Sequence, residues 1–150
     1  MYGTISGVSA LVPAAGALTS TSTPADAQVL EWLKQASARI DRTLASSGYS
    51  TPVASTATAY AELSALANLY GAAYVLIARG LDSANGEAEN RSDVWIERFN
   101  EELKELATSD LSSLGVTQIT PTQPARRRLR TLQWRRVDGY AELDTGEVAE

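Results

Sequence analysis

The stretch YAELSALANLYGAAYVLIARG, residues 60–80, decides the fold. Its apolar side chains recur every three or four residues in two adjoining stripes, and only Glu62 and Arg79 carry charge. This spacing predicts an α-helix, which we expect to begin near residues 55–56 and to end at Gly80. A helix that is apolar around so much of its circumference is typical of a bundle centre or of a subunit interface.

Two amphipathic helices flank this stretch. The upstream helix is predicted to start with Thr23 as N-cap and Pro24 as its first residue, and to end near Ser46. The downstream helix is predicted between about residues 90 and 115. The fold class is therefore mainly α, a small bundle of three main helices. The apolar side chains expected in its core are Val29, Leu33, Ile40, Leu44, Leu63, Tyr70, Tyr74, Ile77, Ile96, Phe99 and Leu103.

The predicted bundle domain covers residues 24–115, with an extension at each end. Residues 1–23 carry no charge and little periodicity, so we expect an extended N-terminal arm. Such an arm is either floppy or ordered against another subunit. Residues 116–150 are expected to form a C-terminal extension that contains an Arg-rich stretch.

The pair Asp138-Gly139 lies between alternating residues near the C-terminus, which favours a β-hairpin over residues 131–144. A two-residue loop matches side chains of similar or complementary character across the two strands. The predicted partners are Val137 with Tyr140, Arg135 with Glu142, and Trp134 with Leu143.

The composition excludes several kinds of catalytic site. The 150 residues include no Cys and no His, which removes disulfides, ordinary zinc sites and the usual Ser-His-Asp and Cys-His arrangements. No GxGxxG, P-loop or GxSxG motif is present. We therefore expect no enzymatic activity, no catalytic residue, no cofactor and no metal. The longest apolar stretch, residues 71–78, is too short to span a bilayer, so no membrane partner is expected.

Charge is distributed in blocks along the chain, whose net charge is −5. Residues 126–136 contain six Arg and no acid, whereas residues 137–150 contain five acids and no base. The Arg block suits docking on an acidic protein surface, binding to nucleic acid, or a solvated strand. Its expected interface residues are Arg126, Arg127, Arg128, Arg130, Trp134, Arg135 and Arg136.

The predicted third helix carries an acidic face with Glu97, Glu101 and Glu105. Solvation accounts for such a face, and contact with a basic surface is the alternative interpretation. We include these three glutamates among the expected interface residues. A hydrolase built on this cluster is disfavoured because no base with a tuned neighbour accompanies it.

Three segments resemble a known family. They are ASARIDRTL (residues 36–44), GYSTPV (residues 48–53) and the apolar helix of residues 60–80. Together they are similar to the small helical head–tail connector proteins of tailed bacteriophages, the adaptor or head-completion group beneath the portal. In that family an Ile-Asp pair, here Ile40-Asp41, precedes an aromatic and a Pro, here Tyr49 and Pro52.

The resemblance implies a structural protein of the virion neck, made in the cytoplasm of the bacterial host. It implies a ring of about twelve copies that contacts the portal protein above and a stopper or tail protein below. DNA would pass through the channel of this ring without sequence-specific binding. The alternative hypothesis is a small nucleic-acid-binding module that acts through residues 126–136.

Overall fold

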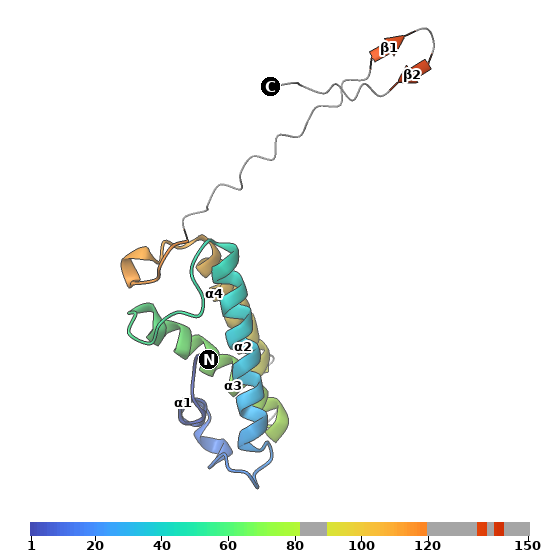
Figure 1. The fold of residues 1–150 in the computed structure, drawn as a ribbon. Helices are drawn as coiled ribbons and strands as arrows, with labels where there is room; N and C mark the ends of the chain where they lie inside the picture. Colours follow the sequence, from blue (N-terminus) through green and yellow to red (C-terminus); the bar gives the residue numbers. More distant parts are fainter. Residues whose placement is uncertain (82–89, 120–134, 138–139, 143–150) are drawn as a thin grey trace. The chain divides into compact units, whose positions relative to one another are not determined.

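The computed structural model describes residues 1–81, 90–119, 135–137 and 140–142. The chain divides into two compact units, Met1–Thr120 and Pro121–Glu150. The first unit is mainly α and consists of four packed helices (Figure 1). They are α1 (Ile5–Leu11), α2 (Asp26–Ser46), α3 (Ala59–Arg79) and α4 (Arg91–Thr108), with short 3-10 turns at Pro13–Ala15 and Ser112–Leu114.

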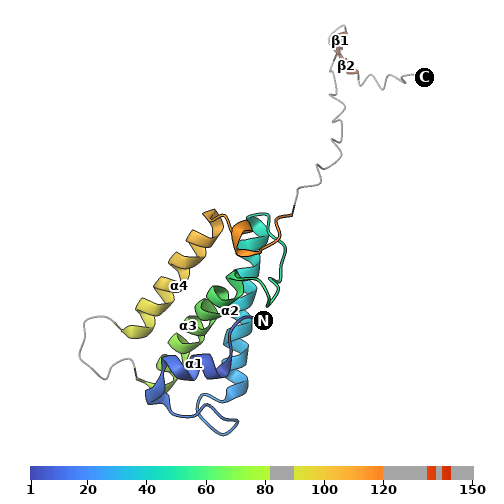
Figure 2. The same cartoon turned by 90° about the vertical axis from the view of Figure 1, so that its left-hand side faces the viewer.

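Helix α3 is the central helix of the first unit, since it packs against α1, α2 and α4 (Figure 2). By length and composition it is apolar enough to cross a membrane, because an 18-residue window within it has a mean hydropathy of 1.3. Half of that apolar window is buried inside the bundle. Packing against three neighbouring helices therefore accounts for its composition.

Helix α3 ends where the sequence predicts, but it begins later than predicted. Gly80 adopts the left-handed conformation with φ +62°, and the N–H of Leu81 donates to the carbonyl of Leu76, which closes the helix. The helix begins at Ala59, three to four residues later than predicted, because residues 54–58 form turns instead.

Most of the predicted core is buried, which confirms the helical stripes. Seven of the eleven expected side chains lie inside the first unit: Val29, Leu33, Ile40, Leu44, Leu63, Tyr70 and Phe99. Tyr74, Ile96 and Leu103 are half-buried. Ile77 is 48% exposed, because α3 turns Ala73 and Leu76 toward its neighbours at this end.

The prediction of an extended N-terminal arm is wrong. Residues 5–11 form helix α1, and Tyr2, Val8, Val12 and Ala15 are buried in the core of the same chain. The segment lies close to α3 because Gly71 has no side chain. A Cβ at Gly71 would lie 3.0 Å from Cγ2 of Val8. Since α1 has only one fully buried residue, its sequence lacks the repeated stripe that marks the longer helices.

The predicted cap of α2 is also wrong. The helix begins at Asp26 with Ala25 as N-cap, and Thr23 provides no side-chain cap. The N–H of Asp26 donates to the carbonyl of Thr19, and the hydroxyl of Ser22 donates to the carbonyl of Pro24. These bonds hold the chain in a turn, so Pro24 precedes the helix instead of beginning it.

The chain beyond Gly115 continues the first unit instead of starting an extension. The N–H of Ser50 donates to the carbonyl of Thr117 at 2.8 Å, and the N–H of Ile119 donates to the carbonyl of Gly48 at 2.6 Å. These bonds tie the connector between α2 and α3 to the chain after α4. The compact unit therefore ends at Thr120, five residues beyond the predicted domain boundary.

In the second unit the structure describes two short strands, β1 (Arg135–Val137) and β2 (Tyr140–Glu142), which pair antiparallel. Val137 faces Tyr140 and Arg135 faces Glu142, the two pairings that the Asp138-Gly139 turn predicts. The third predicted pairing, Trp134 with Leu143, lies outside the described residues.

Candidate interaction surface on helices α3 and α4

The predicted interface residues of the Arg block are placed only in part. Arg135 and Arg136 lie in strand β1, where only the backbone is described. The others lie outside the described residues: Arg126, Arg127, Arg128, Arg130 and Trp134. The described part of the candidate surface is therefore the helical unit.

The predicted acidic residues do come together on α4. Glu97, Glu101 and Glu105 are exposed at intervals of four residues, which places them on one helix face. With Val94, Arg98 and Glu102 they line a shallow depression of about 440 Å³, which we call the acidic pocket.

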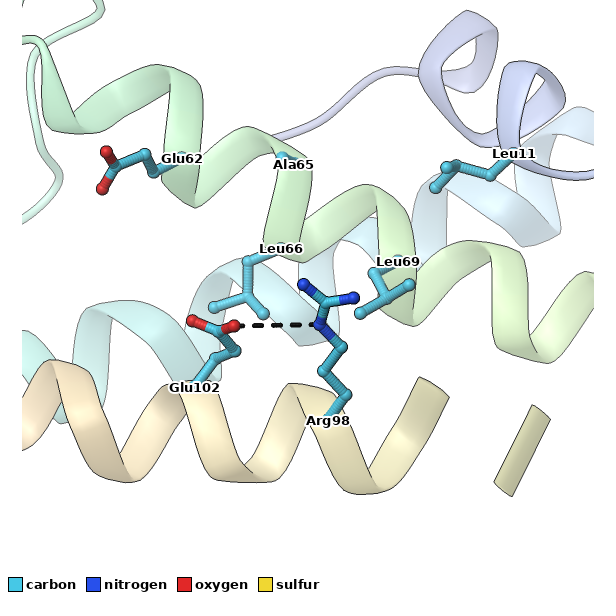
Figure 3. A pocket seen from close by; sticks show the side chains of 7 residues that line it. All are labelled: Leu11, Glu62, Ala65, Leu66, Leu69, Arg98 and Glu102. Carbon is cyan, nitrogen blue, oxygen red and sulfur yellow. Dashed lines mark ion pairs between the residues drawn. The ribbon is translucent and has the colours of Figure 1, made fainter. Parts of the chain in front are cut away.

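A second depression, which we call the apolar pocket, has a volume of about 330 Å³ and lies between α3 and α4 (Figure 3). Leu66 and Leu69 of α3 and Leu11 of α1 provide its apolar surface. The remaining lining residues are Glu62, Ala65, Arg98 and Glu102. Arg98 and Glu102 line both pockets, so the two depressions adjoin at these side chains, and we call them together the α3–α4 groove.

Packing of α4 explains why its acidic face points outward. Phe99 is fully buried and lies 4.8 Å, ring centre to ring centre, from Tyr70 of α3. Glu97 and Glu101 lie two residues before and after Phe99, so they project from the opposite side of the helix and are exposed. Glu102 lies three residues after Phe99, close to the buried side, and is half-buried. Burial of this side of α4, with Trp95, Leu103 and Leu106 also packed against the core, thus turns the acidic face outward.

Electrostatic pairing inside the groove is weak. Nε of Arg98 lies 3.8 Å from Oε1 of Glu102, and the two side chains are 67% and 45% exposed. An exposed ion pair of this length contributes about 0–1 kcal/mol. Across the two pockets the walls carry five glutamates and one arginine, so the groove presents net negative charge.

No protein-family model, curated protein or solved structure matches the chain. The resemblance to phage connectors therefore rests on the sequence segments alone.

The perturbed acids and phenols of the first unit are structural. Burial, followed by hydrogen bonding to Asp41, raises the pKa of Tyr2 well above its usual range, and burial raises the pKa of Tyr70 to about 12. Hydrogen bonds with Ser112 lower the pKa of the Asp110 carboxyl. Each group thus keeps its ordinary neutral-pH charge state, unlike a general base tuned toward neutral pH. Among the described residues, no cluster of Asp and Glu is arranged to hold a metal ion.

Sequence reasoning missed the α1 and α3 side of the groove. Glu62 was visible as one of two charges in an apolar helix, and Leu66 and Leu69 belong to its second stripe. No local sequence pattern marks Leu11 as part of this surface. It lies exposed beside α3 because α1 packs there. Only the packed helices show that these residues and the α4 glutamates share one surface.

Proposed function

We propose that the protein is a head-to-tail adaptor of a tailed bacteriophage, a structural component of the virion neck. The observation that carries this proposal is the exposed α3–α4 groove, with its apolar floor and glutamate walls, on a unit followed by a separate Arg-rich unit. A subunit with complementary surfaces in two places suits assembly with copies of itself. The family resemblance adds the portal above and a stopper or tail protein below.

The proposed assembly is a ring of about twelve copies, the number that the resemblance implies, around a channel that DNA crosses without sequence-specific contacts. Contacts with neighbours are assigned to the groove and to the C-terminal unit. The N-terminal segment has no such role in this proposal, because it packs into the core of its own chain. The absence of His and Cys costs a structural subunit nothing, and we propose no enzymatic activity, cofactor or metal.

An assembly experiment with portal-bearing, DNA-filled capsids tests the adaptor proposal. Purified full-length protein is mixed with the capsids, and the particles are imaged for additional density at the portal vertex. A new ring at that vertex is the expected result. A matched variant with the six arginines of residues 126–136 changed to Ser is expected to form fewer rings. Capsids without new density would count against the adaptor.

The alternative is a nucleic-acid-binding module, which is favoured by the six arginines and one Trp within residues 126–136. Binding of free DNA by this segment should weaken steeply with salt, because Arg contacts release counterions from phosphate. The Arg-to-Ser variant should abolish that binding. Salt-sensitive DNA binding without rings at the portal vertex would make this alternative the preferred function.

A further inference from the structure

We propose that the α3–α4 groove of one copy binds residues 126–136 of a second copy of this chain. The inference rests on the proposed function, because it names the partner and the surface of the contact between adjacent adaptor subunits. It assigns the groove as the receiving surface and the Arg block as the inserted segment.

The groove offers an apolar floor that its own chain leaves open to solvent. Leu11 is 40% exposed and Leu69 is half-buried, and both line the apolar pocket. Figure 3 shows Leu11, Leu66 and Leu69 around the same depression, with Glu62 and Glu102 at its edges. Apolar side chains rimmed by charged groups are typical of an interaction site.

The groove also offers negative charge next to that floor. The acidic pocket adjoins the apolar pocket at Arg98 and Glu102, and it adds Glu97, Glu101 and Glu105. The matching occupant is a segment that carries both apolar and positively charged side chains. A purely apolar partner would remove water from these carboxylates without supplying a positive charge or hydrogen-bond donor in its place, which is unfavourable.

Residues 126–136, RRRLRTLQWRR, have the required pattern. Six arginines are interleaved with Leu129, Leu132 and Trp134, and the segment contains no acid. Arg makes planar bidentate contacts with carboxylates, and Trp is a frequent anchor in interface pockets. The segment therefore complements both halves of the groove, the apolar one and the acidic one.

In a subunit that assembles with copies of itself, the segment that occupies the groove is expected to come from a second copy and not from the same chain. A segment and a groove at different places on one chain form a head-to-tail contact when they join two copies. Such heterologous contacts close into rings when the rotation between subunits allows it. The contact thus supplies the kind of interface that the proposed adaptor ring requires.

Disulfide trapping between full-length chains tests the contact, since the natural chain has no Cys to interfere. Ala65→Cys places a thiol at the exposed lining of the apolar pocket, and Thr131→Cys places one in the middle of the Arg block. The two variants are mixed and oxidised, and the mixed dimer is quantified by mass. Ala78→Cys, exposed on the same helix and outside both pockets, is the matched control.

We expect about tenfold more mixed dimer with Ala65→Cys than with Ala78→Cys, because docking raises the local concentration of the two thiols. The excess should shrink at about 0.5 M salt, where charges are screened within a few ångströms. It should also shrink when Glu97→Gln and Glu101→Gln are added to the Ala65→Cys chain. Both glutamates are exposed, so these changes leave the core intact.

Equal yields from Ala65→Cys and Ala78→Cys would overturn the inference. A double variant, Ala65→Cys with Thr131→Cys, would also overturn the inference if it closed an internal disulfide while the mixed single variants gave no excess dimer. In that case the segment would bind the groove of its own chain. Rings at the portal without trapped dimers would refute only the groove contact. Trapped dimers without rings would leave the groove contact standing and refute only the adaptor.

Discussion

The phenol oxygen of Tyr2 lies 2.6 Å from Oδ1 of Asp41 and donates a hydrogen bond to it. The same oxygen accepts a hydrogen bond from the backbone N–H of Val53 at 2.8 Å, and the backbone N–H of Tyr2 donates to Oγ of Ser37. The second residue of the chain thus joins α2 to the connector that precedes α3. This arrangement makes the N-terminus part of the folded core.

Tyr2→Phe should lower the free energy of unfolding by about 1–3 kcal/mol, because it leaves the buried N–H of Val53 without its acceptor. Urea unfolding followed by circular dichroism measures the change. Tyr60→Phe is the control, since the hydroxyl of Tyr60 donates to the carbonyl of Met1 at an exposed site and its loss should cost about 0.5 kcal/mol or less. Equal losses in the two variants would contradict the central role of Tyr2.

Deletion of residues 1–15 should lower the free energy of unfolding by about 4 kcal/mol or more, because it removes the buried side chains of Tyr2, Val8 and Val12. Deletion of residues 121–150 is the matched control. It should leave the urea midpoint of the helical unit unchanged, because that unit is compact by itself up to Thr120. An N-terminal deletion without effect on stability would restore the interpretation of residues 1–23 as an arm.

Phe99→Ala should lower the free energy of unfolding by about 3–5 kcal/mol, since Phe99 is the fully buried aromatic residue of α4 and its ring packs at a tilt against that of Tyr70. Val94→Ala on the same helix should change stability by only about 0.5 kcal/mol, because Val94 is 41% exposed. Hydrogen exchange should show that the Phe99 variant loses protection first in α4. Uniform loss of protection over all helices would argue against a local anchor.

Stability should fall as the pH rises from about 10 to about 12. Burial, and then the hydrogen bond that Tyr70 donates to Tyr74, raise the pKa of Tyr70 from 10.0 to about 12. The unfolded chain therefore loses this proton near pH 10 while the folded chain retains it, so the stabilisation is complete below about pH 10 and is lost as the pH rises through the folded pKa.

Thermal unfolding midpoints between about pH 9 and pH 11.5 measure this loss, and Tyr70→Phe should decline less steeply than the natural chain because it removes one such group. Tyr2, whose pKa is raised in the same direction by burial, contributes to the remaining slope. A slope that Tyr70→Phe does not change would show that this phenol does not govern the alkaline limit.

Long helices were predictable because a buried stripe repeats many times along them. Val29, Leu33, Ala36, Ile40 and Leu44 follow steps of three and four, and all five are buried in α2. The pairing of β1 with β2 was predictable for a similar reason, since a two-residue turn fixes the partners on either side.

The candidate surface was predictable only in its α4 half. Glu97, Glu101 and Glu105 recur at helical spacing, so their common face can be derived from the sequence. The apolar half joins Leu11 of α1 to Leu69 of α3, which no local pattern connects. The groove exists because these helices meet α4 through contacts between distant parts of the chain.

The sequence by itself determined the three long helices, the block distribution of charge and the absence of His and Cys, because each depends on local repetition or on composition. Only the tertiary structure decided that the N-terminal segment belongs to the core and that α3 and α4 share a groove. The bonds of Tyr2 to Ser37, Asp41 and Val53 span 35, 39 and 51 residues. Such pairings depend on how the helices pack together, and no spacing between neighbouring residues encodes them.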